Sequence, residues 1–209
     1  MAISLSNRVQ RVKPSPTLAI TALAAQLRSE GKDIIGLGAG EPDFDTPEHI
    51  KRSAVEAIED GFTKYTAVDG TPSLKQAVVD KFKRENGVDY ALNQVMVSCG
   101  GKQVFYNLCQ ALLNEGDEVI IPAPYWVSYP DMVMLADATP VIVSAGIEQS
   151  FKITPEQLEA AITPKTKLFV HNTPSNPTSV MYNESELKAL GQVLKRHPEV
   201  VIASDDIYE

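Results

Sequence analysis

Residues 167–203 read KLFVHNTPSNPTSVMYNESELKALGQVLKRHPEVVIA and predict a strand, a helix and a second strand. The runs 167–170 and 200–203 are short and apolar at most positions, as strands covered on both faces are. Between them, leucine and valine recur at helical spacing over residues 184–196. Strands that alternate with helices in this way indicate a layered α/β domain with a mainly parallel sheet.

The same alternation extends through most of the chain. Three further runs of branched apolar residues predict strands at 95–98, 119–121 and 140–143. Apolar residues at helical spacing predict helices at 17–30, 48–59, 73–86, 103–114 and 155–162. In an open sheet of this kind, ligands collect beyond the carboxyl ends of the strands, so the loops that follow strands are the candidate sites.

Residues 31–47, GKDIIGLGAGEPDFDTP, interrupt this alternation with four glycines and two prolines. Such a stretch is typical of a loop, and we interpret it as a crossing between an N-terminal arm and the main domain. The expected boundaries are 1–45 for the arm and 46–209 for the main domain.

The composition is that of a globular chain without an extended basic surface. It has 209 residues, 19 basic and 27 acidic side chains, a formal net charge of −8 and 44% hydrophobic residues. A chain of this length buries about 70% of its unfolded surface on folding and needs no metal or disulfide to do so. The acidic balance, with no cluster of lysine and arginine, argues against nucleic acid or an anionic membrane as a partner.

Two cysteines, Cys99 and Cys109, cannot make a disulfide framework, and no Cys-x-x-Cys or His-x-x-x-His pair predicts a metal site. Residues 1–16 contain no apolar core of a signal peptide, and the sequence contains no run of about 20 apolar residues. We therefore expect a cytoplasmic protein in a reducing compartment.

A glycine-rich turn, Cys99-Gly100-Gly101-Lys102, follows the predicted strand 95–98 and precedes a helix. Two glycines let the backbone approach a ligand, and the free N–H groups of a first helical turn favour an anion such as phosphate. An ordinary strand-to-helix turn is an equal alternative. The turn lacks the spacing of a Walker loop, and GLGAGE at 36–41 does not complete the dinucleotide motif GxGxxG.

Two adjacent carboxylates, Asp205 and Asp206, come directly after the apolar strand 200–203 and Ser204. Because side chains alternate along a strand, only one of the two can face a ligand on a given side. A magnesium-binding Walker B element and a plain turn are the alternatives, and the missing phosphate loop weakens the first.

A stretch rich in proline and asparagine follows the predicted strand 167–170. Pro177 would fix Asn176, whose amide would then be a positioned donor at the same sheet edge as Asp205, and a rigid turn without a ligand is the alternative. We hypothesise an unusual peptide geometry at Asn176–Pro177, with cis as the candidate.

Two aromatic side chains stand in predicted loops. Trp126, the single tryptophan, lies in PAPYWVSYP at 122–130 after a strand, and Tyr65 lies in KYTAVDG at 64–70. A rigidly held flat ring suits stacking on another flat ring. Packing of the tryptophan between helix and sheet, and of the tyrosine as an ordinary loop residue, are the alternatives.

Taken in order, these stretches resemble the class I aminotransferases that use pyridoxal 5′-phosphate, and most closely the bacterial aspartate aminotransferase subgroup. The resemblance covers the whole chain in the order of the family. It implies a three-layer α/β fold, that of fold type I pyridoxal-phosphate enzymes, with residues 1–45 as arm and small-domain segment and 46–209 as an incomplete large domain. The motifs that carry it are GEPDFDTP at 40–47, KYTAVDGTPSLKQAV at 64–78, SCGGKQ at 98–103, PYWVSYP at 124–130, TPSNPTS at 173–179 and SDDIYE at 204–209.

The resemblance implies cofactor contacts at matching positions. Asp205 matches the carboxylate that pairs with the protonated pyridine nitrogen and so keeps the ring an electron sink. Tyr208 and Asn176 match the residues that hydrogen-bond the phenolic oxygen of the cofactor, and Trp126 matches the aromatic residue stacked on the ring.

Further matches concern the phosphate of the cofactor. Gly101, Lys102 and Gln103 occupy positions where the family holds that phosphate at a helix N-terminus. Tyr65 matches the tyrosine that reaches the phosphate of the neighbouring subunit, which implies a homodimer with shared sites.

The resemblance also implies amino-acid and 2-oxo-acid substrates. Gly40 matches the glycine whose backbone meets the α-carboxylate of the substrate. Lys13, Ser15, Thr17 and Lys102 match residues near the distal carboxylate of a dicarboxylic substrate. The implied activity is transamination between aspartate, or a similar amino acid, and 2-oxoglutarate.

Two positions depart from the family and one residue is missing. Ser179 replaces the usual glycine of NPTG, which costs on the order of 1 kcal/mol if that position needs a positive φ. Asp206 replaces the usual glutamate of DEIY. The family carries its cofactor on a lysine that follows a later strand in a Ser-x-x-Lys-like stretch, and no lysine of this chain directly follows a predicted strand in that way. We expect that lysine beyond Glu209, so that the 209-residue chain alone is inactive.

Other functions remain open at this point. A prephenate or aromatic aminotransferase or a β-lyase would keep the cofactor and change the reaction. A non-catalytic pyridoxal-phosphate-binding module would belong to another class of protein, although no DNA-binding helix-turn-helix precedes the main domain in residues 1–45.

Overall fold

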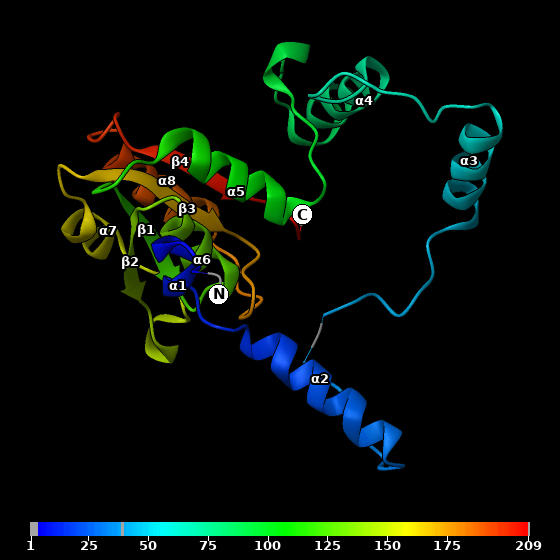
Figure 1. Ribbon diagram of the computed structural model, residues 1–209. Coiled ribbons are helices and arrows are strands. Elements are labelled where there is room, and N and C mark those ends of the chain that lie inside the picture. Colours follow the sequence, from blue (N-terminus) through cyan, green and yellow to red (C-terminus); the bar gives the residue numbers. More distant parts are fainter. Residues whose placement is uncertain (1–3, 39, 209) are drawn as a thin grey trace. The chain divides into compact units, whose positions relative to one another are not determined.

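The computed structural model describes residues 4–38 and 40–208, which fall into two compact units. We call them the sheet unit, Met1–Lys13 with Cys99–Glu209, and the helical unit, Pro14–Ser98 (Figure 1). The expected division of the chain at residue 45 into an arm and a large domain stays a prediction.

Four parallel strands form the centre of the sheet unit, in the order β2-β1-β3-β4. The central strands β1 and β3 are mostly buried, whereas β2 and β4 lie at the edges of the sheet. The strands predicted at 119–121, 140–143, 167–170 and 200–203 are thereby confirmed. Their bounds are β1 Glu118–Ala123, β2 Thr139–Ser144, β3 Thr166–Asn172 and β4 Val201–Asp205.

Helices cover both faces of this sheet. On one face, Val119 and Ile121 of β1 pack in a buried cluster with α5 (Gly101–Leu112) and α6 (Ser128–Leu135). On the other face, Ile120 packs with α7 (Pro155–Ala161) and α8 (Glu184–Leu194). Successive strand residues thus enter opposite clusters, as the period of two requires. The expected α/β fold of three layers with a parallel sheet is confirmed.

A short helix, α1 (Asn7–Arg11), lies against α6 within the sheet unit. Arg8 Nη1 lies 3.6 Å from Asp137 Oδ2, and Arg11 Nη2 donates a hydrogen bond to Asp137 Oδ1. These ion pairs are largely exposed, so each contributes at most about 1 kcal/mol, but together they attach the start of the arm to the end of α6.

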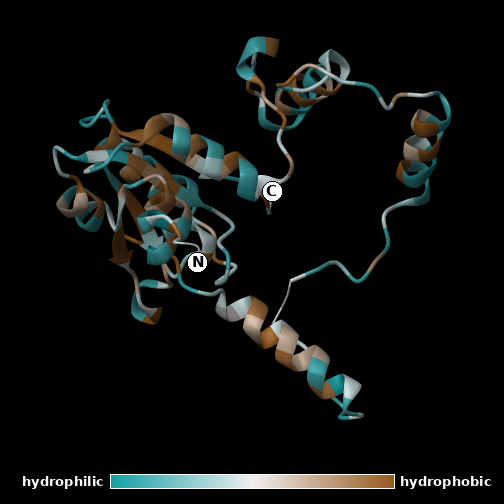
Figure 2. Ribbon diagram, in the orientation of Figure 1, coloured by the Kyte–Doolittle hydropathy of each residue, from teal (hydrophilic) through white to brown (hydrophobic). Residues whose placement is uncertain are grey.

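The helical unit contains α2 (Pro16–Ser29), α3 (Glu48–Glu59) and α4 (Pro72–Lys81), followed by a π-helical turn, η1 (Phe82–Asn86), and a 3₁₀ turn, η2 (Leu92–Gln94). These helices confirm the segments predicted at 17–30, 48–59 and 73–86. Both α2 and α3 contain apolar residues, drawn brown in Figure 2. Several of these side chains are exposed, among them Leu18, Leu23, Ile50 and Ile58. In the part of the chain that the structure describes, no helix combines the length and apolarity needed to cross a membrane.

The strand predicted at 95–98 is wrong. Residues 95–98 have no strand partner, and Val97 N instead donates to Asp69 O at 3.0 Å. A branched apolar run becomes a strand only where a neighbouring strand completes its hydrogen-bond ladder, and periodicity carries no information about that neighbour.

Sequence reasoning also missed α6, because PAPYWVSYP was interpreted as a loop on account of its prolines. The structure begins α6 at Ser128, so Pro130 lies in its first turn. Proline is tolerated there because the N–H groups of the first turn have no partner within the helix.

Candidate functional site

The last residues of β3 and β4, Asn172 and Asp205, lie side by side in register. Asn172 Nδ2 donates to the main-chain oxygen of Asp205 at 2.9 Å. The carboxyl ends of two neighbouring parallel strands are thereby tied together, and this edge is where open α/β sheets bind ligands.

The carboxylate of Asp205 is held from two directions. Tyr129 Oη donates to Oδ2, and the main-chain N–H of Ile207 donates to Oδ1 at 3.2 Å. Asp206 has a different partner, because its Oδ1 accepts a bond from Ser204 Oγ at 2.8 Å. Each ionised carboxylate oxygen can accept more than one bond, so Asp205 retains acceptor capacity for a ligand N–H.

Tyr129 is a buried donor that keeps its proton. It is 2% exposed, and burial raises the pKa of its phenol, with the bond to Asp205 raising that pKa further. Its ring also packs against Phe105, with centroids 4.9 Å apart. Tyr129 thus presents a fixed O–H to Asp205 from the first turn of α6.

Asn176 and Tyr208 meet beside this carboxylate. Asn176 Nδ2 donates to Tyr208 Oη at 3.2 Å, and Asn176 N donates to Asn172 Oδ1 at 2.8 Å. The peptide bond Asn176–Pro177 is cis, which confirms the hypothesis drawn from the sequence. An open hollow of about 360 Å³ lies over this pair and is lined by Pro174, Ser175, Asn176, Pro177, Ser179 and Tyr208.

Ser179, which stands where the family usually has glycine, has the positive φ at which a serine is strained. Its φ is 59°, in the left-handed region that favours glycine. The turn around it is closed by two main-chain bonds, from Ser179 N to Ser175 O at 2.8 Å and from Ser175 N to Val180 O at 3.0 Å. This turn forms one wall of the hollow.

A glycine with a positive φ precedes α5, and the anion site expected at this turn stays a prediction. Gly100 has a φ of 88°, and the helix starts at Gly101, so the free N–H groups of a 12-residue helix begin there. Gln103 Oε1 accepts a bond from Cys99 N at 2.7 Å. The side chain of Gln103 therefore braces the turn itself.

Lys102 and Trp126 lie together. Lys102 Nζ lies 5.2 Å from the ring centroid of Trp126, which is a cation–π contact. The indole also meets Tyr129 edge to face, with centroids 5.2 Å apart and an interplanar angle of 84°, and packs partly buried against the cluster under α5 and α6. The packing alternative for Trp126 is therefore observed, and its role in stacking stays a prediction.

The remaining predicted residues lie in the arm and the helical unit. Lys13 is exposed, and Ser15 caps α2 by accepting a bond from Leu18 N at 3.4 Å. Thr17 lies in the first turn of α2, and Gly40 and Tyr65 are exposed. Their roles toward substrate and cofactor stay predictions.

Sequence reasoning did not assign Tyr129 or Asn172 to the site. Tyr129 lies in the first turn of α6, and its bond to Asp205 joins residues 76 positions apart, so no local pattern indicates it. Asn172 is the last residue of β3, and its position opposite Asp205 follows from strand order and register, which no local pattern provides.

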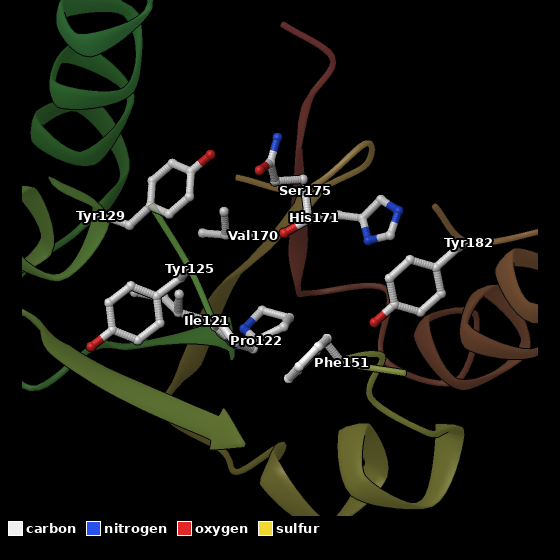
Figure 3. Close-up of a pocket in the computed structure, with 11 residues that line it drawn as sticks. Ile121, Pro122, Tyr125, Tyr129, Phe151, Val170, His171, Ser175 and Tyr182 are labelled. Atoms are coloured by element: carbon white, nitrogen blue, oxygen red, sulfur yellow. The ribbon is translucent and has the colours of Figure 1, made fainter. Parts of the chain in front are cut away.

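A second, partly open cavity of about 30 Å³ lies near this edge and is too small for a cofactor (Figure 3). His171, Tyr182, Tyr125 and Phe151 line it. His171 is 9% exposed, and within the described residues its Nε2 has no hydrogen-bond partner. Burial lowers the pKa of His171, so the imidazole is neutral near pH 7.

Comparison with known proteins agrees with this geometry. Residues 32–209 match the family model described as aminotransferase class I and II. The chain is 62% identical over 207 residues to the aspartate/prephenate aminotransferase of Nitrosomonas europaea, covering 99% of this chain and 52% of that protein. It is 63% identical over 205 residues to the aspartate/prephenate aminotransferase of Cereibacter sphaeroides, covering 98% and 51%. The chain spans about half the length of the curated relatives it matches.

Solved structures are similar over the same extent. The aspartate aminotransferase of Rhizobium meliloti superposes with a TM-score of 0.94 at 48% identity, covering 98% of this chain and 51% of that one. The aspartate aminotransferase of Thermus thermophilus with maleate superposes with a TM-score of 0.93 at 46% identity, covering 98% and 53%. The fold is therefore that of the aspartate aminotransferases, fold type I, and class I aminotransferases use pyridoxal 5′-phosphate as their cofactor. A family model that spans residues 32–209, together with relatives this similar, shows that the chain belongs to the class I and II aminotransferase family.

Proposed function

We propose that the complete protein catalyses transamination between aspartate, or a similar dicarboxylic amino acid, and 2-oxoglutarate. The observation that carries this proposal is the carboxylate of Asp205, fixed by Tyr129 Oη and Ile207 N at the shared end of β3 and β4. A fixed anion at that edge is the group that a protonated pyridine nitrogen requires.

The side chains at this edge fit pyridoxal phosphate in their chemistry. Asp205 offers acceptor capacity for the ring N–H, and the pair Asn176–Tyr208 offers an amide and a phenol for the phenolic oxygen. The start of α5 at Gly101 and the ammonium of Lys102 offer donors for a phosphate. The hollow of about 360 Å³ beside Asn176 and Tyr208 falls in the range of cofactor sites, which is about 300–1,000 Å³.

When bound, the cofactor supplies an electron sink for the bond changes at the α-carbon of the substrate. In our proposal Asp205 holds a proton at the pyridine nitrogen, and Tyr129 orients Asp205. Asn176 and Tyr208 fix the phenolic oxygen, and Trp126 lies against the ring. Gly101, Lys102 and Gln103 retain the phosphate at the first turn of α5.

Substrate recognition in this proposal uses the arm. Gly40 would meet the α-carboxylate through its backbone, and a side chain there would meet nothing within 4 Å in the helical unit itself. Lys13, Ser15, Thr17 and Lys102 would contact the distal carboxylate. One of the similar structures, the Thermus aspartate aminotransferase, was solved with maleate, which is a dicarboxylate. Prephenate is a second candidate substrate, because the relatives from Nitrosomonas and Cereibacter are named for aspartate and prephenate.

Further parts of the proposal concern the whole molecule. We infer a homodimer with shared sites in which Tyr65 reaches the phosphate bound by the other subunit, and a division of the chain at residue 45 into arm and large domain. The lysine that would carry the cofactor covalently would lie outside the 209 residues. A cytoplasmic location agrees with Cys99 and Cys109 both being free thiols.

Steady-state kinetics of the complete protein tests this function. We expect kcat/KM for aspartate with 2-oxoglutarate to exceed that for aromatic amino acids, and elimination from cystathionine to be absent. Prephenate turnover at a rate similar to that of oxaloacetate formation would broaden the assignment to both substrates. Cofactor binding without turnover of any amino acid would favour a non-catalytic binding module instead.

A further inference from the structure

Lys75 has an unusual environment in the helical unit. Among the residues of 14–98 whose burial the structure describes, it alone is buried, although it is a lysine in a unit whose apolar side chains are largely exposed. Its side chain is 10% exposed and forms an ion pair with Asp69, whose side chain is 47% exposed. Burial removes the hydration of an ammonium group, a cost that only a paired charge and hydrogen bonds can offset, so the contact with Asp69 is a specific arrangement.

The aliphatic part of Lys75 packs under a tight turn. Gly70 has a φ of 105°, and a Cβ built on it would lie 3.7 Å from Lys75 Cγ and 2.8 Å from Val97 Cγ2. Val97 N donates to Asp69 O at 3.0 Å. Lys75 and Val97 therefore pack against the backbone of residues 69–70, and a side chain at Gly70 would displace Val97.

The same turn is closed on its other side. Gly70 N donates to Ala67 O at 3.2 Å, and Thr71 Oγ1 caps α4 by accepting a bond from Leu74 N at 3.3 Å. The segment that leads into this turn ends in two fully exposed side chains, Tyr65 and Val68. The hydrogen-bonded turn at 67–70 thus lies beside two side chains, Tyr65 and Val68, that nothing in the helical unit covers.

Replacing a buried charge by an apolar group of similar size is often neutral or stabilising, so the buried ammonium of Lys75 is not explained by stability alone. We propose that Lys75 is a positioning residue, which holds the 67–70 turn through Asp69 so that Tyr65 is presented to the cofactor phosphate of a second copy of this chain. This inference rests on the proposed function, which assigns that contact to Tyr65.

Binding of pyridoxal phosphate and of pyridoxal to the complete apoprotein tests the inference, because only the former carries the phosphate. Lys75→Met should raise the dissociation constant of pyridoxal phosphate about tenfold and leave that of pyridoxal unchanged, and Lys75→Arg should restore most of the loss. Tyr65→Phe should give the same pattern, and the double variant should be no weaker than Tyr65→Phe alone. Lys83→Met is the matched control, because Lys83 pairs with Asp89 at 2.9 Å in an exposed position.

Asp69→Asn provides a second test if Lys75→Met does not fold, since it removes the partner charge from the more exposed side. Equal loss of affinity for both ligands, or effects of Lys75→Met and Tyr65→Phe that multiply, would overturn the positioning role. An unchanged affinity in Lys75→Met and Asp69→Asn would do the same. Failure of the wild-type protein to bind pyridoxal phosphate would instead remove the proposed function, and the inference with it.

Discussion

Tyr129 donates a hydrogen bond to Asp205 across 76 residues of sequence, from the first turn of α6 to the last residue of β4. The two residues come from different layers of the domain, one from a covering helix and one from the sheet. The bond therefore fixes the direction of the Asp205 carboxylate by means of the tertiary fold, and not by local structure.

Tyr129→Phe removes this donor and keeps the ring that packs against Phe105. Hydrogen bonds to charged groups contribute about 1.5–3 kcal/mol, so we expect cofactor affinity to fall roughly ten- to a hundredfold. Titration of the apoprotein with pyridoxal phosphate measures the change. Tyr106→Phe, an exposed position on α5, is the control and should bind as the wild type does.

Ser179→Gly should stabilise the protein. Ser179 has a φ of 59°, and relief of its left-handed strain, offset in part by the greater freedom of glycine in the unfolded chain, leaves about 0.5–1 kcal/mol. Urea unfolding measures this gain. Ser175→Gly in the same turn, where φ is not positive, should lower stability; a loss in both variants would show that Ser179 is not strained.

His171 should make stability depend on pH below neutrality. Burial lowers its pKa from the usual 6.5, and the charge of Asp206 opposes this shift only in part. The unfolded chain therefore binds a proton at His171 that the folded chain excludes. The free energy of unfolding is thus highest above about pH 6.5 and falls as the pH drops below that value.

His171→Gln removes that titration, so its unfolding free energy should fall less between about pH 7 and pH 5 than that of the wild type. His49→Gln on α3, an exposed position, is the control and should keep the wild-type slope. Urea unfolding at several pH values provides the comparison, and identical slopes for all three proteins would contradict the role given to burial of His171.

The 209-residue chain by itself should not transaminate, because within residues 4–38 and 40–208 no lysine directly follows a strand in a Ser-x-x-Lys-like stretch. After borohydride treatment in the presence of pyridoxal phosphate, no one lysine should carry the cofactor stoichiometrically. Stoichiometric attachment to one lysine, detected by mass spectrometry, together with turnover of aspartate, would contradict this expectation.

Much of the sheet unit could be predicted from the sequence. The central strands β1 and β3 are covered on both faces, so their apolar runs at 119–121 and 167–170 predict strands, and the helices that cover them show the matching spacing. Asn176 and Asp205 could be placed at one edge of the sheet, because each follows a predicted parallel strand. The hypothesis of a cis bond before Pro177 rests on the local sequence, and the structure confirms it.

What could not be predicted depends on contacts distant in sequence. The run at 95–98 has the composition of a strand, but its main-chain partner is the turn at Asp69, so it forms no ladder. The site role of Tyr129 could not be predicted, because the neighbouring Pro130 indicates a loop. The structure places Pro130 in the first turn of α6, where proline is tolerated. The sequence does not predict that Lys75 is buried, because its burial depends on packing against Gly70 and Val97.

The central claim is that Asp205, and not its neighbour, serves the cofactor. Asp205→Asn in the complete protein should lower kcat for aspartate with 2-oxoglutarate by about 10²–10³, as removal of one preorganised electrostatic group does. Asp206→Asn should stay within about twofold of the wild type, because Asp206 is bonded to Ser204 and not to Tyr129. Near-normal turnover in Asp205→Asn, or an equal loss in both variants, would contradict the account.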